Sequence, residues 1–392
     1  MKDKIYSRKS VLRLVFLLFA IGVLPPVVRR ASAQTMPTPS MSGPLALPST
    51  LTVNGGPLGK LNVGGIVSGI GMVQGNWVPG DQVSRWDLSN GQIFIEKNSG
   101  WWQFFVQAGA YNIPDLGLPT MSTNAWVRDL YGPLPQGFLK IQPNPKGNFS
   151  IEIGALPTLI GAEYTFDFEN MNIERGLLWN QENAVNRGIQ INDSIGKLSA
   201  SISWNDGFYS NRYTWLWGSL SYAINPSNTI AFVGGGNLGQ TKFTTFATPV
   251  QNNGQIYNVL YTYSHESWVI NPYFQYTNVP TNPEIGIVHG SSTTGGALLL
   301  TYNLKHGISF SGRGEYISSS GNLADSAVNL LYGPGSSAWS ITLTPTYRKD
   351  NFFVRGEFGL VQARNITPGN AFGSLGLNKA QPRGVIEAGL IF

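Results

Sequence analysis

Polar and apolar residues alternate along many short segments of this 392-residue chain. Residues 198–205 read LSASISWN, residues 308–316 read ISFSGRGEY and residues 339–347 read WSITLTPTY. In each segment nearly every second side chain is apolar, glycine or aromatic, and its neighbours are mostly polar. Because successive side chains of a strand point to opposite faces, this period predicts β-strands with one apolar face and one polar face.

Seven tight turns separate such strands into hairpins. Most of them contain the Gly, Pro, Asn, Asp or Ser that tight turns require. The turns centre on residues 97–100, 145–148, 193–196, 225–228, 264–267, 304–307 and 348–351. A first strand near 61–74 and a last strand near 384–392 remain, and their pairing would close a ring of about sixteen strands. The other connections are long, and short turns at one end with long loops at the other are typical of outer-membrane barrels.

The composition favours a membrane barrel over a soluble β-sandwich. Only 12% of residues are charged, about half the usual fraction for soluble proteins, while 12% are aromatic. Aromatic side chains gather near predicted strand ends, as at Trp101, Trp204, Trp215 and Trp268, which suits the two membrane interfaces. A closed barrel leaves no unpaired sheet edge in lipid. We therefore predict an all-β fold, a transmembrane antiparallel β-barrel.

The N-terminus predicts export. Residues 1–33 combine a basic start, an apolar run over 14–24 and the motif Ala31-Ser32-Ala33, as a signal peptide does. Residues 34–58 are rich in Pro, Ser, Thr and Gly and predict a flexible periplasmic leader, which leaves 59–392 for the barrel. The chain has no cysteine, which excludes disulfides and a lipoprotein anchor.

The excess of Lys and Arg over Asp and Glu in this chain lies within the predicted signal peptide. Residues 1–33 hold seven of the 26 Lys and Arg residues and one of the 21 acidic residues, which leaves 19 basic and 20 acidic residues beyond them. A nucleic-acid partner is therefore not expected.

A family resemblance covers residues 153–207. It is carried by Gly161-Ala162-Glu163, by Asn172-Ile173-Glu174-Arg175, by Gly188 at the start of a strand and by Asn205-Asp206-Gly207. These motifs resemble the OmpL-like family of β-barrel porins, and the layout of leader, hairpins and terminal Phe392 is similar over most of the remaining chain. The resemblance implies a pore in the bacterial outer membrane and no particular substrate.

The polar faces of the strands would line the lumen. Charged side chains are costly against lipid but are tolerated in a wet interior, and sixteen strands leave an aqueous channel. The charged residues expected to line the lumen are Glu96, Lys140, Glu152, Arg313, Glu315, Arg355, Glu357 and Glu387.

The longest loop, about residues 156–186, is the candidate constriction. Its charged residues are Glu163, Asp167, Glu169, Glu174 and Glu182 against Arg175 alone. A long loop in a wide barrel either folds inward and sets a transverse field that selects ions, or covers the surface as a solvated lid. Glu163 and Asp167 are the best candidates for the constriction. Neutralising Glu182 should leave selectivity unchanged if it sits at the outer rim.

These features predict an outer-membrane porin for passive diffusion of small polar solutes and ions, with a weak preference for cations. The alternative is a non-conducting barrel that acts as an adhesin or structural surface protein. The histidines His265 and His306 fall in short turns and His289 in a loop, so a shared catalytic site is not expected. We expect no enzyme activity, cofactor or metal. The expected partners are outer-membrane lipid and the solutes themselves, and the sequence leaves a homotrimer open.

Overall fold

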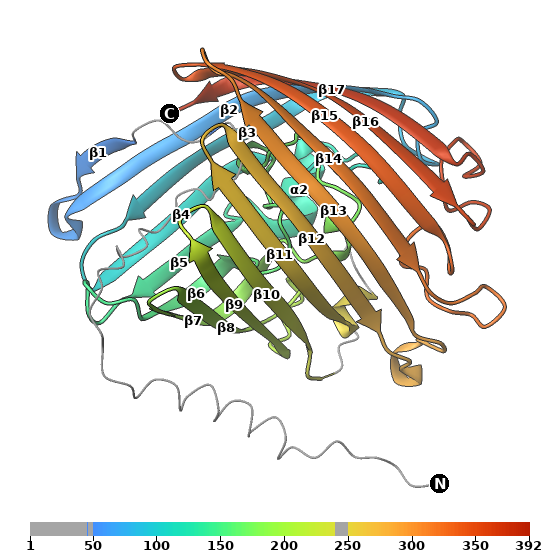
Figure 1. Ribbon diagram of the computed structural model, residues 1–392, viewed down its shortest axis with the longest axis horizontal. Helices are drawn as coiled ribbons and strands as arrows, with labels where there is room; N and C mark the ends of the chain where they lie inside the picture. The colour runs from blue at the N-terminus through green and yellow to red at the C-terminus, as the bar shows by residue number, and fades with distance from the viewer. Residues whose placement is uncertain (1–44, 46–49, 240–249) are drawn as a thin grey trace, which may run out of the picture. The chain divides into compact units, whose positions relative to one another are not determined.

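The computed structural model describes Leu45, residues 50–239 and residues 250–392. Within them, sixteen strands, β2 to β17, form a closed antiparallel ring in which each strand pairs with the next along the chain and β17 pairs with β2 (Figure 1). The predicted barrel of sixteen strands is confirmed.

The strands of the ring differ in length, and β4 to β6 are among the shorter ones. In chain order they are β2 (Lys60–Gln74), β3 (Ser84–Lys97), β4 (Trp102–Tyr111), β5 (Gln136–Ile141), β6 (Ser150–Pro157), β7 (Val185–Ile195), β8 (Leu198–Asn205), β9 (Trp215–Asn225), β10 (Asn228–Asn237), β11 (Gln255–His265), β12 (Trp268–Val279), β13 (Ser291–Asn303), β14 (Ile308–Ser319), β15 (Ser337–Lys349), β16 (Phe352–Arg364) and β17 (Ala380–Ile391).

All seven predicted turns join neighbouring strands, from the β3–β4 turn to the β15–β16 turn. The connections at the other end of the barrel are longer. Two of them matter most below: residues 112–135 between β4 and β5, and residues 158–184 between β6 and β7. Since β2 starts and β17 ends at the short-turn end, the ring begins and closes there, as the hairpin count predicted.

A further strand, β1 (Leu51–Asn54), lies within the stretch predicted as a flexible leader. It pairs with the first residues of β2, next to the point where Phe392 and Gly65 exchange backbone hydrogen bonds of 2.7 and 3.0 Å. The leader prediction therefore needs correction at these residues. The start of β2 extends past the end of β17, and β1 supplies partners for backbone groups that would otherwise be unpaired. The predicted signal peptide, residues 1–33, lies outside the described residues. Of residues 34–49, only Leu45 is described.

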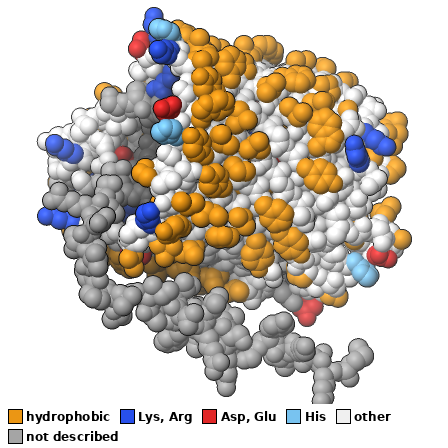
Figure 2. Space-filling model, viewed as in Figure 1, with side chains coloured by type: hydrophobic (Ala, Val, Ile, Leu, Met, Phe, Trp, Pro, Cys, Tyr) orange, Lys and Arg blue, Asp and Glu red, His pale blue; other side chains and the backbone are white. Residues whose placement is uncertain are grey.

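The strand faces separate as the alternation predicted. On β15, Ile341 and Leu343 are 47% and 56% exposed on the outside, whereas Thr342 between them faces inward and is fully buried. Figure 2 shows hydrophobic side chains spread over the visible outer wall, with charged side chains at its margins. In the described part of the chain, no helix has the length and apolar character needed to cross a membrane.

The aromatic side chains near strand ends face outward in most cases, but not at Trp215. The side chains of Trp204 and Trp268 are exposed on the outer face. Trp215 instead points inward, is 1% exposed, and stacks on Trp217 with 5.0 Å between ring centroids. The physical reason is strand parity, because Trp215 and Trp217 share the inner face of β9 with Ser219.

Two long connections fold into the ring (Figure 1). The lumen loop (residues 158–184) contains the short 3-10 helices η4 (Asp167–Glu169) and η5 (Trp179–Gln181). The second lumen segment (residues 112–135) contains α2 (Thr123–Trp126) and the π-helical turn η3 (Val127–Tyr131). Phe166 and Phe168 of the lumen loop pack into one apolar cluster with Phe94 and Tyr111 of the wall.

Candidate constriction site

The lumen loop runs inside the barrel, across to the inner faces of β14 to β17. Its residues from Thr165 to Trp179 are all buried. Its polar groups meet strand residues more than 130 positions away in the sequence, such as Glu315 and Glu357. Of the two interpretations of this loop, the inward one describes the structure.

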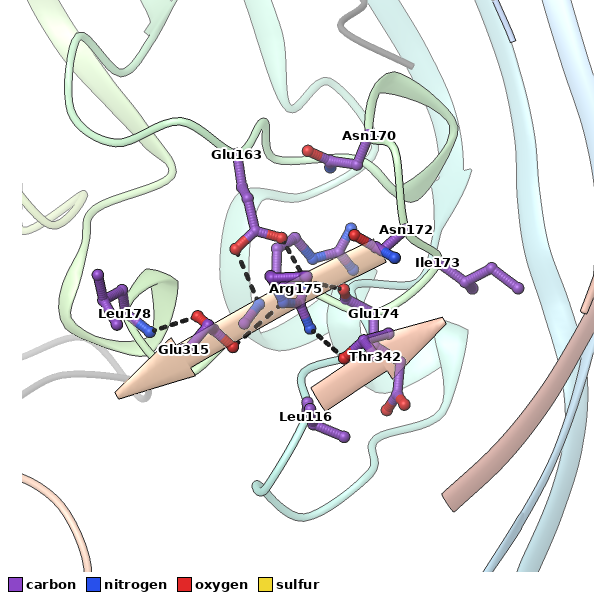
Figure 3. A network of polar contacts seen from close by, with 12 residues as sticks. Leu116, Glu163, Asn170, Asn172, Ile173, Glu174, Arg175, Leu178, Glu315 and Thr342 are labelled. Atoms are coloured by element: carbon purple, nitrogen blue, oxygen red, sulfur yellow. Dashed lines mark hydrogen bonds and ion pairs between the residues drawn. The ribbon is translucent and has the colours of Figure 1, made fainter. Parts of the chain in front are cut away.

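Arg313 on β14 is the centre of the contact between loop and wall. Its Nη1 lies 2.6 Å from Glu163 Oε1 and donates to the Glu174 carbonyl at 2.7 Å, while its Nε lies 3.1 Å from Glu315 Oε2. Its Nη2 donates to the Thr342 hydroxyl at 3.2 Å. Figure 3 shows this network between the loop and the wall residues Glu315 and Thr342. One buried guanidinium thus joins two strands to two points of the loop.

Wall carboxylates hold the loop backbone as well. Glu357 accepts from the amides of Ile173 and Glu174 at 2.6 and 2.9 Å. Glu315 accepts from the amides of Leu177 and Leu178 at 3.1 and 3.3 Å. These four hydrogen bonds fix the middle of the lumen loop against β14 and β16.

A second arginine, Arg355 on β16, pairs with Glu387 on β17 and donates to the carbonyls of Asp167 and Asn170 at 3.3 Å. The Asp167 carboxylate is directed to β3, where it accepts from Asn90 Nδ2 at 2.7 Å and from the Ser89 hydroxyl. Asp167 and Arg355 therefore meet through the loop backbone rather than through a direct side-chain pair.

Of three further charged residues of the loop, Glu174 and Arg175 form ion pairs with other segments, whereas Glu169 binds within its own turn. Glu174 pairs with Arg383 of β17 at 2.5 Å, and Arg175 lies 3.4 Å from Asp115 of the second lumen segment. Glu169 accepts from the amide of Phe166 in its own turn at 3.0 Å. The predicted constriction residues Glu163, Asp167, Glu169, Glu174 and Arg175 are thus all placed inside the barrel, and each of these five has its own partner.

Sequence reasoning missed Arg383 and Asp115. The last strand was predicted to begin at residue 384, but β17 begins at Ala380. The period of two would have found Arg383, since it shares the inner face with Val385 and Glu387. Asp115 has no comparable signal, because it lies in an irregular segment.

Three other predicted lumen residues lie apart from this network. Glu96 of β3 faces inward and accepts from Asn62 and Asn98 at 3.4 and 3.3 Å. Lys140 of β5 and Glu152 of β6 face each other across the strands at 3.7 Å. They line the inner wall, and these hydrogen bonds and this ion pair involve residues outside the lumen loop.

The charged wall residues were expected to border water, and here the structure differs. Arg313, Arg355 and Glu387 are at most 2% exposed. The reason is that the lumen loop covers them and accepts hydrogen bonds from Arg313 and Arg355, while Glu387 pairs with Arg355.

Acidic groups outnumber basic groups at this contact. The carboxyl groups are those of Asp115, Glu163, Asp167, Glu169, Glu174, Glu182, Glu315, Glu357 and Glu387, and the guanidinium groups those of Arg175, Arg313, Arg355 and Arg383. Burial raises the pKa of Asp115 to about 7 although Arg175 opposes it, and burial raises the pKa of Glu169 to about 8. Their charge therefore depends on pH near neutrality.

The three histidines do not share a site. His265 ends β11 at a short turn, His306 lies in the β13–β14 turn and His289 in the β12–β13 loop, so the three are dispersed. Among the residues that the structure describes, no group of three or more His, Asp or Glu could hold a metal ion.

A closed sixteen-stranded ring with an apolar outer wall and an inward-folded charged loop defines a porin-like β-barrel of the bacterial outer membrane. The chain belongs to the OmpL-like family described as "Putative beta-barrel porin-2", which it matches over residues 60–392. The resemblance seen in the sequence is thereby confirmed. No curated protein matches the sequence significantly.

Solved structures share the fold at low sequence identity. The outer membrane channel DcaP of Acinetobacter baumannii is similar with a TM-score of 0.57 at 9% identity, covering 85% of this chain and 97% of that one. The trimer form of OmpT of Vibrio cholerae gives 0.56 at 12% identity, with 85% and 99% covered. OmpF of Salmonella typhi gives 0.52 at 13% identity, with 87% and 100% covered.

Proposed function

We propose that the protein is a porin through which small polar solutes and ions diffuse passively, with a weak preference for cations. The observation that carries the proposal is the excess of carboxyl over guanidinium groups where the lumen loop meets the wall. Fixed negative charge in a passage raises the local concentration of cations. The direct ion pairs, such as Glu163 with Arg313, cancel part of the field, which keeps the preference weak.

The inner wall away from the loop supports a wet passage. On β8 and β9, Ser199 faces Ser221 and Ser201 faces Ser219, and all four are partly exposed on the inner face. Small hydroxyl side chains leave room for water and bind it. Because these serine side chains are uncharged, this wall favours small polar solutes whether they are neutral, positive or negative.

The test is electrical. The purified protein, inserted into a planar bilayer, should give discrete conductance steps, and a KCl gradient should give a reversal potential of the sign expected for K⁺ preference. The preference should vanish above about 1 M salt, where the Debye length falls to about 3 Å. Folded barrel without conductance would favour the adhesin or structural alternative, and a reversal potential of the opposite sign would refute the charge argument.

Assembly as a homotrimer is part of the same proposal. It is supported by the shared fold with OmpT of Vibrio cholerae, one structure of which is described as a trimer form. Native mass spectrometry from detergent would measure it, and a monomer mass alone would contradict it.

A further inference from the structure

Glu182 lies near the C-terminal end of the lumen loop, directly after η5, and its side chain is buried, with 4% exposure. It was a candidate for the outer rim, but the structure places it inside the barrel. Among the described residues, neither oxygen of its carboxyl group has a hydrogen-bond partner. Every other carboxyl group of the lumen loop has at least one such partner. A buried carboxyl group without partners is costly when it is charged and far less costly when it is neutral.

Among the described residues, no cation is placed to neutralise Glu182. Its charged neighbours are the carboxylates of Glu163 in the loop and Glu315 on β14. The nearby guanidinium of Arg313 is already committed to those two carboxylates, to a carbonyl and to Thr342. The Tyr273 hydroxyl of β12 approaches the carboxyl group but does not reach hydrogen-bond geometry.

The loop also closes tightly over this carboxyl group. Gly161 has φ +82°, and a Cβ atom at that position would lie 1.8 Å from Glu182 Oε2. The amide of Gly161 is held by Asn258 of β11 at 3.2 Å. A hydrated carboxylate would need space that Gly161 and Tyr273 now occupy.

We propose that Glu182 is a proton-binding latch of the lumen loop: the loop docks against β12 and β14 while this carboxyl group is protonated, and its ionisation releases the segment around η5. Burial and the two neighbouring carboxylates raise the pKa of Glu182 well above its ordinary value, as this arrangement requires. Ionisation adds a third carboxylate beside Glu163 and Glu315, whose hydrogen bonds hold the amides of Gly176, Leu177 and Leu178.

The inference rests on the proposed channel, since release of the loop would widen its passage, but it can be tested without conduction. Because the chain has no cysteine, one can be introduced at a chosen place. Gln181, adjacent to Glu182 and 3% exposed, is suitable. Asp115 and Glu169 also titrate near neutrality, but Asp115 lies in the second lumen segment and Glu169 lies in η4 of the lumen loop, so the probe belongs at Gln181, next to Glu182.

The experiment compares Gln181→Cys alone with Gln181→Cys in the Glu182→Gln background. The rate of modification by a thiosulfonate reagent is measured on the folded barrel from pH 6 to pH 10. The two proteins share the thiol, and a carboxylate beside it disfavours the thiolate, so thiol ionisation by itself cannot make the ratio of their rates rise with pH. We expect the rate for Gln181→Cys alone, divided by the rate in the Glu182→Gln background, to rise at least tenfold from pH 6 to pH 10. Glu284→Gln, an exposed glutamate of the β12–β13 loop, serves as the matched control and should leave the pH response unchanged.

The conductance of the parent protein should rise over the same pH range, and the rise should be smaller in Glu182→Gln. A modification ratio that stays constant with pH would overturn the latch, whether or not the channel conducts. A rising ratio in a barrel without conductance would support the latch and refute the proposed channel, so the two failures are distinguishable. Should Gln181→Cys fail to give folded barrel, hydrogen exchange of residues 176–183 compared between parent and Glu182→Gln makes the same decision.

Discussion

The ion pair between Glu174 and Arg383 should respond unequally to removal of its two partners. The pair joins the lumen loop to β17 at 2.5 Å, and both side chains are fully buried. Breaking a buried pair typically costs about 3–5 kcal/mol, because the remaining charge is left without its partner. The structure indicates which variant belongs at which end of that range.

In Glu174→Gln, the guanidinium of Arg383 keeps several acceptors. These are Gln74 Oε1 at 2.9 Å and the carbonyls of Asp115 and Leu118, each at 2.9 Å. We therefore expect a cost near the lower end, about 3 kcal/mol. In Arg383→Gln, the carboxylate of Glu174 loses the partner of Oε1, and its Oε2 already lacks one among the described residues. This variant should approach about 5 kcal/mol.

The cost should appear as opening of the loop rather than unfolding of the ring, because the backbone ladder of β17 does not involve the Arg383 side chain. Hydrogen exchange measures such local opening. At about 1.4 kcal/mol per factor of ten, amides 173–176 should exchange roughly 10²-fold faster in Glu174→Gln and more than 10³-fold faster in Arg383→Gln.

The control is Arg128→Gln, which removes an exposed pair with Asp129 in the second lumen segment and should change exchange little. If Arg383→Gln exchanged no faster at residues 173–176 than Arg128→Gln, the pair would not hold the loop. Equal acceleration in β14 would mean that the whole barrel opens, which would also refute the reasoning.

The remaining predictions concern the two faces of the barrel wall and the preference of the channel for cations. Ile202→Arg should lower the free energy of unfolding by roughly 2–4 kcal/mol, because Ile202 faces outward on β8. Ser201→Arg, on the partly exposed inner face, should lower it much less. Urea unfolding in lipid vesicles measures both losses, and equal losses would contradict the face assignment. Glu163→Gln combined with Asp167→Asn should lower the cation preference, seen as a reversal potential closer to zero, and an unchanged potential would exclude both residues from the field. Lowering the pH from 9 to 6 should weaken the cation preference too, because Asp115 and Glu169 have raised pKa values, about 7 and about 8, and lose charge as they bind protons.

The fold was predictable from the sequence because each strand carries its own local signal. Alternation assigns a face to every residue of a strand, as at Ile341, Thr342 and Leu343, and turn residues mark where strands reverse. Counting hairpins then gives the ring. The errors lie where a local pattern is ambiguous: Trp215 has an aromatic side chain near a strand end, but its parity with Ser219 places it inside.

The site was predictable only in its composition. Sequence patterns identified the inward-facing charges of the wall and the acidic loop, but not the pairs between them. Glu163 and Arg313 are 150 positions apart, and Glu174 and Arg383 are 209 apart. Nothing local in a chain fixes which carboxylate of an irregular loop meets which arginine of a distant strand, since that depends on how the loop crosses the lumen.

The inward course of the loop did have a sequence signal, in its apolar residues rather than its charges. Phe166, Phe168, Ile173, Leu177 and Leu178 are all fully buried. An exposed lid would have no means of burying so many apolar side chains, whereas a loop inside a barrel can pack them on the wall and on the second lumen segment. Charge alone fits either course, because carboxylates are soluble on a surface and can be paired in a lumen. The combination of apolar residues with more carboxylates than the loop can neutralise by itself requires an interior that supplies arginines, and the polar faces of β14, β16 and β17 supply them.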